Sequence, residues 1–343
     1  MAFAPEIVNS AQTGRASLAT QAVPLCLLCS TRGEPLYSGL EDRLFNAPGI
    51  WKLNKCTNVA CGLAWLDPMP IEKDVSKAYD TYYTHSSKEI EQVPSLKRVI
   101  VRNTIRLFNL VTLPLGLRRE RYRRSMMYLE TQVPRKLLEI GCGNGSFLDR
   151  MRAKGWDVQG VEVDGKAAKV ASNVFGLRVF IGTLHQAAFP DDYFDAITLS
   201  HVIEHVHDPI SLLKECRRVL RPRGCVVIIT PNIESLGHAW FGNNWLHLDP
   251  PRHLQIFSRR TISMAADKAG LKGFDTWTTP VNAEGSYMGS TEIRMRGRHR
   301  FGDEAASFPL AIKAICFEIW ALLYWRRFPS SGEEVVLRVL NDE

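Results

Sequence analysis

One short segment concentrates the side chains best suited to acid–base or metal chemistry. The stretch "SHVIEHVHDP" holds three histidines and one glutamate within seven positions, among them His201, Glu204 and His205. The spacing His-x-x-Glu-His admits three interpretations: a metal site, a proton-transfer site, or a strand end that is rich in histidine. Imidazoles titrate near neutral pH and also ligate metals, so residue type alone does not separate these alternatives.

The neighbouring pattern argues against a zinc-protease helix. An inverted zinc-protease signature needs both histidines and the glutamate on one helix face. Here His201 directly follows an apolar strand predicted over 195–200, and the next helix is capped only at Asp208. We therefore favour proton transfer, with His201 or His205 as a base beside an acceptor and Glu204 orienting it. Histidines that merely pack and cap the strand end are the alternative.

A glycine-rich turn follows the first predicted strand of the same region. In "LLEIGCGNGSFL", the glycines are Gly141, Gly143 and Gly145, and they let the backbone approach a ligand closely. A tight strand-to-helix turn without a ligand is the alternative. Two carboxylates sharpen the ligand interpretation, since Glu139 ends that strand and Glu162 ends the next one. At the second position a carboxylate can accept hydrogen bonds from both hydroxyls of a ribose.

Strand and helix patterns alternate from residue 135 onward. Strands are predicted over 136–140, 157–163, 178–183, 195–200, 226–230 and 334–340, and helices over 146–154, 164–175, 208–220 and 258–270. Strands without polar alternation are buried on both faces, as in a parallel sheet covered by helices. The pattern therefore predicts a doubly wound α/β domain, in which ligands bind outside the carboxyl ends of the strands.

These segments resemble a known family. The stretches "LLEIGCGNGSFL", "VQGVEVD", "FPDDYFDAITLSHVIEHVHDP" and "LLKECRRVLRPRG" are similar, in order, to the motifs of class I S-adenosylmethionine-dependent methyltransferases, over about residues 135–232. The resemblance implies a Rossmann-like fold and S-adenosylmethionine as cofactor. The resemblance places Glu139, Gly141 and Gly143 around the amino-acid end of the cofactor, Glu162 on the ribose, Leu184 by the adenine, and Ser200 and His201 near the transferable methyl group. Gly145, in the same turn, is a further candidate for cofactor binding.

The histidine segment also resembles a stretch of ubiquinone-pathway O-methyltransferases. In that family the pattern is Glu-x-x-Glu-His and holds a divalent metal, whereas His201 occupies the first acidic place here. Methyl transfer needs in-line alignment of donor and acceptor and removal of the acceptor's proton. It needs no covalent enzyme nucleophile, and the sequence indicates none.

Four of the eight cysteines form a pattern near the amino end. Two residues separate Cys26 from Cys29, four separate Cys56 from Cys61, and 26 lie between the pairs. Paired thiols at this spacing are typical of a structural zinc site with sulfur in all four positions, and four unliganded thiols are the alternative. The arrangement resembles the zinc-binding module ahead of some bacterial sugar C-methyltransferases. An rRNA guanine methyltransferase family also carries a small zinc module.

A loop after the fifth strand is the candidate acceptor site. The stretch "NNWLHLDPPRHLQIFS" lies at the same predicted sheet edge as the histidine segment. It concentrates four candidate substrate contacts, which are Trp245, His247, Arg252 and His253. A structural loop made rigid by two prolines is the alternative.

The rest of the chain divides into recognisable regions. We expect a disordered leader over 1–24, a zinc-ribbon-like module over 25–70, a helical connector or lid over 71–134, and a methyltransferase domain over 135–343. The tyrosine-rich stretch over 78–87 is the candidate lid, with packing between modules as the alternative. The basic segment "LRRERYRRSMM" over 117–127 could meet phosphate or a membrane surface, or could be a solvated helix face.

Composition sets the remaining expectations. The 343 residues are 45% hydrophobic and 23% charged, which is typical of a globular protein, and the net charge of +7 does not by itself indicate nucleic-acid binding. The apolar run over 308–325 contains Lys313 and Glu318, and no signal-peptide pattern is evident, so we expect a cytoplasmic protein. The expected function is methyl transfer to a small-molecule or glycan-linked acceptor. RNA methylation and a non-catalytic cofactor-binding role are the alternatives, and the oligomeric state is not predicted.

Overall fold

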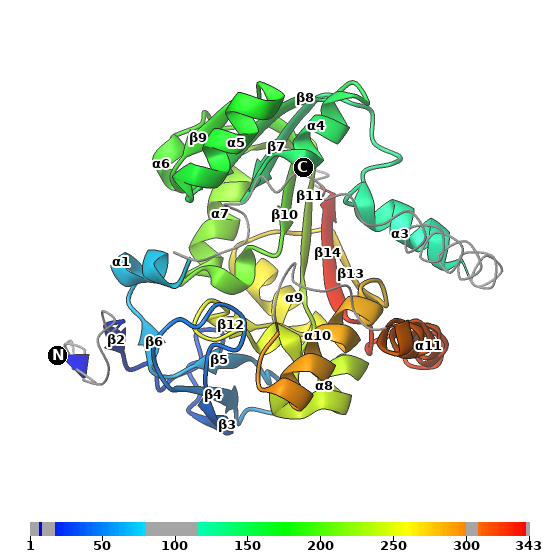
Figure 1. Cartoon of the computed structure of the whole chain (residues 1–343). Helices are drawn as coiled ribbons and strands as arrows, with labels where there is room; N and C mark the ends of the chain where they lie inside the picture. Colours follow the sequence, from blue (N-terminus) through cyan, green and yellow to red (C-terminus); the bar gives the residue numbers. More distant parts are fainter. Residues whose placement is uncertain (1–6, 9–17, 80–115, 300–307, 341–343) are drawn as a thin grey trace.

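The computed structural model describes residues 7–8, 18–79, 116–299 and 308–340. These residues form three sheets, with helices packed around the largest one (Figure 1). The smallest sheet joins β1 (Ile7–Val8), β2 (Thr20–Gln21) and β6 (Met69–Pro70). Most of the predicted leader and of the tyrosine-rich stretch lies outside the described residues.

The largest sheet has seven strands in the order β13–β14–β11–β10–β7–β8–β9. Its parallel strands are β7 (Lys136–Ile140), β8 (Asp157–Glu162), β9 (Val179–Ile181), β10 (Phe194–Ser200) and β11 (Leu220–Pro231). Strand β14 (Glu334–Leu340) runs antiparallel between β11 and β13 (Phe274–Thr279). This is the Rossmann-like α/β architecture of class I methyltransferases that the sequence predicts.

Helices cover both faces of this sheet, because successive residues of a strand point to opposite sides. On β10, Ile197 lies in one core with Leu213 and Ile262, which belong to α7 (Pro209–Val219) and α9 (Arg259–Lys268). Its neighbour Ala196 lies in a second core with Leu148 and Ala171, which belong to α4 (Ser146–Arg152) and α5 (Gly165–Phe175). The predicted helix caps are present, since the Asp208 side chain accepts a hydrogen bond from the backbone of Ser211.

Some elements were not predicted from the sequence. Strand β11 starts at Leu220, earlier than expected, because Leu220 pairs with Phe194 before a register shift. Strand β13, helix α8 (Leu236–Phe241) and helix α10 (Ala283–Arg296) also lack a sequence-based expectation. The sequence of α10 shows little apolar periodicity because small residues do its packing. A Cβ on Gly289 would meet the Leu246 side chain at 2.8 Å.

The cysteine module contributes β3 (Gly33–Leu40), β4 (Trp51–Cys56) and β5 (Ala64–Leu66) to a four-stranded sheet. The fourth strand is β12 (Gln255–Ile256), which comes from the candidate acceptor loop and pairs antiparallel with β5. The sheet thus crosses the boundary that the sequence predicts at residue 70. Figure 1 shows the module lying against α8 and β12.

The described part of the connector consists of short helices. These are α1 (Glu72–Val75), η1 (Ser76–Tyr79) and α3 (Leu117–Ser125). Near the carboxyl end, the apolar run forms α11 (Phe308–Arg327), which packs on α10. Among the described residues, we find no helix with the length and apolar character to span a membrane.

Candidate active site

The glycine turn joins the ends of β7 and β8. Gly141, Gly143 and Gly145 all have positive φ, at 67°, 53° and 81°. The Glu162 carboxylate at the end of β8 accepts a hydrogen bond from the Gly143 backbone at 2.8 Å and another from the Asp164 backbone at 2.9 Å. The strand-end carboxylate and the turn are therefore one unit, as a cofactor site at this edge requires.

Two of these glycines are required by close packing. A Cβ on Gly141 would lie 2.5 Å from the Val202 side chain, so the turn lies directly against the segment that follows β10. A Cβ on Gly145 would lie 2.5 Å from Leu177, where α4 begins against α5. By contrast, a Cβ on Gly143 would meet nothing within 4 Å, so this position borders open space that a ligand can fill.

Two buried carboxyl groups lie beside the turn. Burial raises the pKa of Glu139 well above its ordinary value, and among the described residues its Oε2 atom has no hydrogen-bond partner. Burial also raises the pKa of Glu162, although the amides of Asp164 and Gly143 partly offset this effect. A buried polar atom without a partner marks a place where a ligand group can supply one.

The other two predicted cofactor contacts lie at neighbouring strand ends. Leu184 is the first residue of α6 (Leu184–Ala187), which Thr183 caps, and its side chain is buried in the core. Because this side chain is buried, only the backbone of Leu184 can contact a ligand at this end of α6. Ser200 ends β10 and is half-buried.

The histidine segment forms a strand end and one short helix. His201 follows β10 with a positive φ of 54°, and η3 covers Ile203–His205. The His201 ring places Nε2 2.8 Å from a Glu334 oxygen and Nδ1 3.3 Å from a Glu204 oxygen. Burial lowers the pKa of His201, but the bonds to these two carboxylates outweigh it and raise the pKa to about 9. His201 is therefore a cation at neutral pH.

The carboxylate of Glu334 is buried and is bound by several hydrogen-bond donors. Arg124 of α3 donates two hydrogen bonds to it, at 2.6 and 2.9 Å, and Asn282 donates another at 2.8 Å. Burial would raise the pKa of Glu334, but Arg124 and His201 lower it well below its ordinary value. Residues far apart in the sequence thus hold His201 in place. Sequence reasoning missed both Arg124 and Glu334, since neither lies in a motif.

Two further histidines are neutral. His205 Nδ1 lies 3.0 Å from the Arg252 carbonyl and His253 Nδ1 lies 2.7 Å from the His247 carbonyl. Because a carbonyl only accepts, each Nδ1 carries the proton and each Nε2 keeps its lone pair. Burial lowers the pKa of both His205 and His253 to about 4. Their rings lie 4.7 Å apart.

Glu204 lies between these two histidine sets. Its side chain is fully buried and accepts a hydrogen bond from Thr230 at 3.0 Å. Burial would raise its pKa, but His201 lowers it to about 2. Ligand atoms of Glu204, His205 and His253 lie within 4.8 Å of one another, so these three residues could hold a metal ion. A histidine that binds a metal through one ring nitrogen normally donates its other N–H to a carbonyl or carboxylate, as His205 and His253 do here.

The predicted acceptor loop meets the histidine segment. The His247 ring stacks on the His201 ring at 6.3 Å, and Trp245 lies 5.3 Å from His247. Trp245 is buried and its indole N–H donates to Ser286 at 3.2 Å. Burial lowers the pKa of His247 to about 3. The structure therefore brings two of the four predicted substrate residues, His247 and His253, to the predicted proton-transfer residues, and Trp245 packs behind His247.

Arg252, the fourth, lies in a buried ion-pair cluster. Its guanidinium is fully buried and pairs with Asp42 at 2.7 Å and with Asp249. Asp42 belongs to the cysteine module, and it also accepts hydrogen bonds from the backbone of Leu44 and Ala47. In this arrangement Arg252 joins the module to the acceptor loop.

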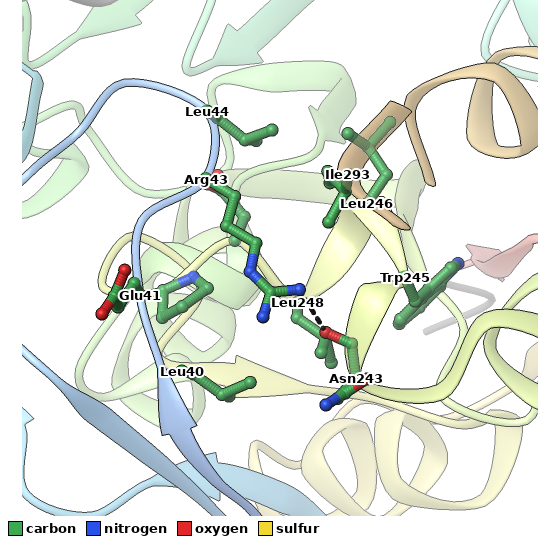
Figure 2. A pocket seen from close by; sticks show the side chains of 11 residues that line it. Leu40, Glu41, Arg43, Leu44, Asn243, Trp245, Leu246, Leu248 and Ile293 are labelled. Carbon is green, nitrogen blue, oxygen red and sulfur yellow. Dashed lines mark hydrogen bonds between the residues drawn. The ribbon is translucent and has the colours of Figure 1, made fainter. Parts of the chain in front are cut away.

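A small hollow opens where the module meets this loop, with room for about one water molecule. Figure 2 shows Trp245, Leu246, Leu248 and Ile293 around it, with Arg43 reaching across from the module. The Arg43 guanidinium donates to the backbone oxygen of Asn243 at 3.2 Å, which fixes its position. Most of these walls are apolar.

The four module cysteines converge as predicted. Cys26 Sγ lies 3.7 Å from Cys61 Sγ, Cys29 Sγ lies 3.4 Å from Cys56 Sγ, and all four sulfurs lie within 4.8 Å of one another. Tetrahedral zinc with bonds of about 2.3 Å requires sulfurs roughly 3.8 Å apart. The four thiols therefore fit a zinc ion.

Comparisons with known proteins point the same way. Residues 116–275 match a family model described as a methyltransferase domain. The ubiquinone biosynthesis O-methyltransferase of Thiobacillus denitrificans is 31% identical over 117 residues, which are 31% of this chain and 50% of that protein. The same-named protein of Bordetella avium is 30% identical over 180 residues, which are 46% of this chain and 72% of the relative. This chain belongs to the S-adenosylmethionine-dependent methyltransferases.

The chain spans about half the length of the first curated relatives it matches. Solved structures similar to this methyltransferase include a SAM-dependent methyltransferase from Archaeoglobus fulgidus, with 20% identity, a TM-score of 0.44, and coverage of 66% of this chain and 93% of that one. Another is Haemonchus contortus phosphoethanolamine N-methyltransferase 2, with 16% identity, a TM-score of 0.45, and coverage of 65% and 53%.

The structure places two further residues against the histidine segment. Tyr79, the first tyrosine of the tyrosine-rich stretch, places its hydroxyl 2.9 Å from His205 Nδ1. Thr230, at the end of β11, bonds the buried Glu204. The clustering of tyrosines was a usable signal for the first residue, whereas the position of Thr230 in an apolar strand gave none.

Proposed function

We propose that this protein transfers the methyl group of S-adenosylmethionine to a small-molecule or glycan-linked acceptor. The observation that carries the proposal is the contact between the two halves of the site. The Gly141 turn, with Glu162 bonded to it, packs against Val202 immediately after His201. A ligand bound on the turn would therefore present its reactive group to the histidine cluster.

The cofactor supplies a methyl group already activated by a positive sulfur. In our proposal, Glu162 binds the ribose hydroxyls by exchanging its backbone partners for them. Glu139 offers its unpartnered oxygen to the amino-acid end, and Gly143 leaves the space open. These residues bind and orient the donor, which is the largest demand of the reaction.

The proton of the acceptor needs a base that is unprotonated at neutral pH. We assign this role to His205, whose lowered pKa keeps the ring neutral and whose Nδ1–H is fixed on a carbonyl. His201 differs, because its pKa of about 9 keeps it charged. We assign His201 the role of holding Glu204 ionised and in place.

Metal binding is the second candidate chemistry at the same residues. The anchored Nδ1–H groups of His205 and His253, with the ionised Glu204 between them, favour it. A divalent ion there would polarise an acceptor oxygen. Chelator treatment that abolishes activity while the cysteine-bound zinc remains would select this chemistry over proton transfer to His205.

The acceptor is proposed to be small because the named relatives are ubiquinone biosynthesis enzymes. The basic helix α3 has less positive charge available for RNA phosphates than its sequence suggests. Arg121, Arg123 and Arg124 form ion pairs with glutamates of the protein itself.

A cytoplasmic location is proposed because four closely spaced thiols require reducing conditions.

The deciding experiment is methyl transfer from tritium-labelled cofactor. The full chain is incubated separately with a small-molecule cell extract and with rRNA. We expect label in the small-molecule fraction. Label in rRNA would replace the proposed acceptor class, and no cofactor turnover with any fraction would indicate a non-catalytic cofactor-binding protein.

A further inference from the structure

An exposed apolar band runs along α11 and onto α8. The exposed fractions are 52% for Trp240, 42% for Ile312, 38% for Trp320, 49% for Leu323 and 46% for Phe328. We call these five residues the α11 band. Four of them lie on or just beyond one helix at spacings that place Ile312, Trp320 and Leu323 on a common face.

The band is continuous and lies opposite a packed face. The Trp240 and Trp320 rings are 5.2 Å apart, and Tyr324 links Trp320 to Phe328 at 6.1 and 4.7 Å. The opposite face of α11 is buried through Ala314, Ala321 and Leu322. At the edge of that face, Phe317 packs on α8 and α10 and also contacts the Trp240 and Trp320 rings. Helix α11 is thus apolar on both sides, and only one side is covered by the described residues.

The exposed charges of α11 have one sign. The exposed charged residues of α11 are Lys313, Arg326 and Arg327. Its acidic residue, Glu318, is fully buried and pairs with Arg121 of α3 at 2.6 Å. This pair ties α11 to α3, and Figure 1 shows the two helices on the same side of the molecule.

We propose that the α11 band docks on the surface of a bilayer that contains anionic lipid. Tryptophan and other large apolar side chains enter the headgroup region, while arginine and lysine meet the phosphates. The helix lies on the surface, because no described helix can span the bilayer. The exposed charges on the same helix are all basic, so the combined apolar and basic surface fits an anionic lipid surface better than a neutral partner.

The test is sedimentation of the full chain with phosphatidylcholine vesicles, with and without phosphatidylglycerol. We expect binding that needs phosphatidylglycerol and weakens at high salt. The double variant Trp320→Ser/Leu323→Ser should lose about tenfold in binding, since two partly exposed anchors are removed. Arg326→Glu/Arg327→Glu should remove the preference for anionic lipid.

Val59→Ser/Ile181→Ser is the matched control, because both residues are more than half exposed and lie elsewhere. It should bind vesicles like the parent. The proposal is overturned if the parent does not sediment, or if the control loses as much binding as the α11 variant. It is also overturned if light scattering shows a dimer that Trp320→Ser/Leu323→Ser dissociates, because a second copy would then cover the band. None of these measurements depends on methyl transfer, so they stand apart from the proposed activity.

Discussion

The two halves of the candidate site are built in different ways. The cofactor half is local, since Glu139, the glycine turn and Glu162 belong to two adjacent strands and one turn. The histidine half is assembled from distant parts of the chain, with Arg124 and Glu334 meeting at His201 and Asp42 meeting Arg252. A fold can therefore keep one cofactor while the acceptor side is rebuilt by segments outside the common motifs.

Removal of one predicted zinc ligand should separate the two halves most strongly. Cys29→Ser should remove the one zinc expected per chain, and structural zinc binding contributes about 10–16 kcal/mol in small modules. The module and its β5–β12 pairing should loosen, while cofactor affinity at the glycine turn should change little. Elemental analysis and calorimetry measure these two effects. Cys316→Ser, at an exposed thiol, is the control, and full metal retention in Cys29→Ser would contradict the site.

Removal of the buried guanidinium should be the next largest effect. Arg252→Ala leaves the Asp42 and Asp249 carboxylates buried without their partner and should lower the free energy of unfolding by about 3–5 kcal/mol. Arg178→Ala, which breaks the exposed pair with Asp157, should cost no more than about 1 kcal/mol. Urea unfolding compares the two variants. Equal costs would mean that Arg252 does not join the module to the acceptor loop.

A substitution in the cofactor half should act on binding alone. Glu162→Ala should weaken S-adenosylmethionine by about 1.5–3 kcal/mol, because hydrogen bonds to a charged group are lost. Asp157→Ala, at the opposite and exposed end of β8, should bind the cofactor like the parent. Calorimetry on folded protein decides the outcome. Unchanged affinity in Glu162→Ala would remove this carboxylate from the cofactor site.

The smallest predicted effect is a pH dependence of the histidine half. His253 has a folded-state pKa of about 4, below the unfolded value, so its contribution to stability is complete above pH ~6.5 and is lost as pH falls toward 4. Between pH ~7.5 and ~5.5 this amounts to about 1 kcal/mol. His253→Gln should show a correspondingly smaller loss in urea unfolding over that range. His201 has the opposite sign, since its pKa of about 9 makes its contribution fade as pH rises through 9. An identical acid dependence in parent and variant would show that His253 is not buried in neutral form.

Features that depend on neighbouring residues could be predicted from the sequence, whereas contacts between distant residues could not. The central strands, the capped helices α7 and α9 and the convergence of Cys26, Cys29, Cys56 and Cys61 follow from local patterns and fixed spacings. The partners of His201 do not, because Glu334 lies in an apolar strand and Arg124 in a helix of five arginines, where nothing singles it out. The ion pair of Arg252 could not be predicted either, because its partner Asp42 lies 210 residues away in the sequence.

The strand pairing between β5 and β12 has a consequence for synthesis of the chain. Trp65 and Gln255 pair although 190 residues separate them. On the ribosome, β5 therefore emerges long before its partner, and its edge stays unpaired while the five parallel strands of the central sheet are translated. Unpaired strand edges invite wrong pairing with other chains. A nascent chain of this protein should thus need its early metal ligation, or a chaperone, until residue 256 has left the exit tunnel.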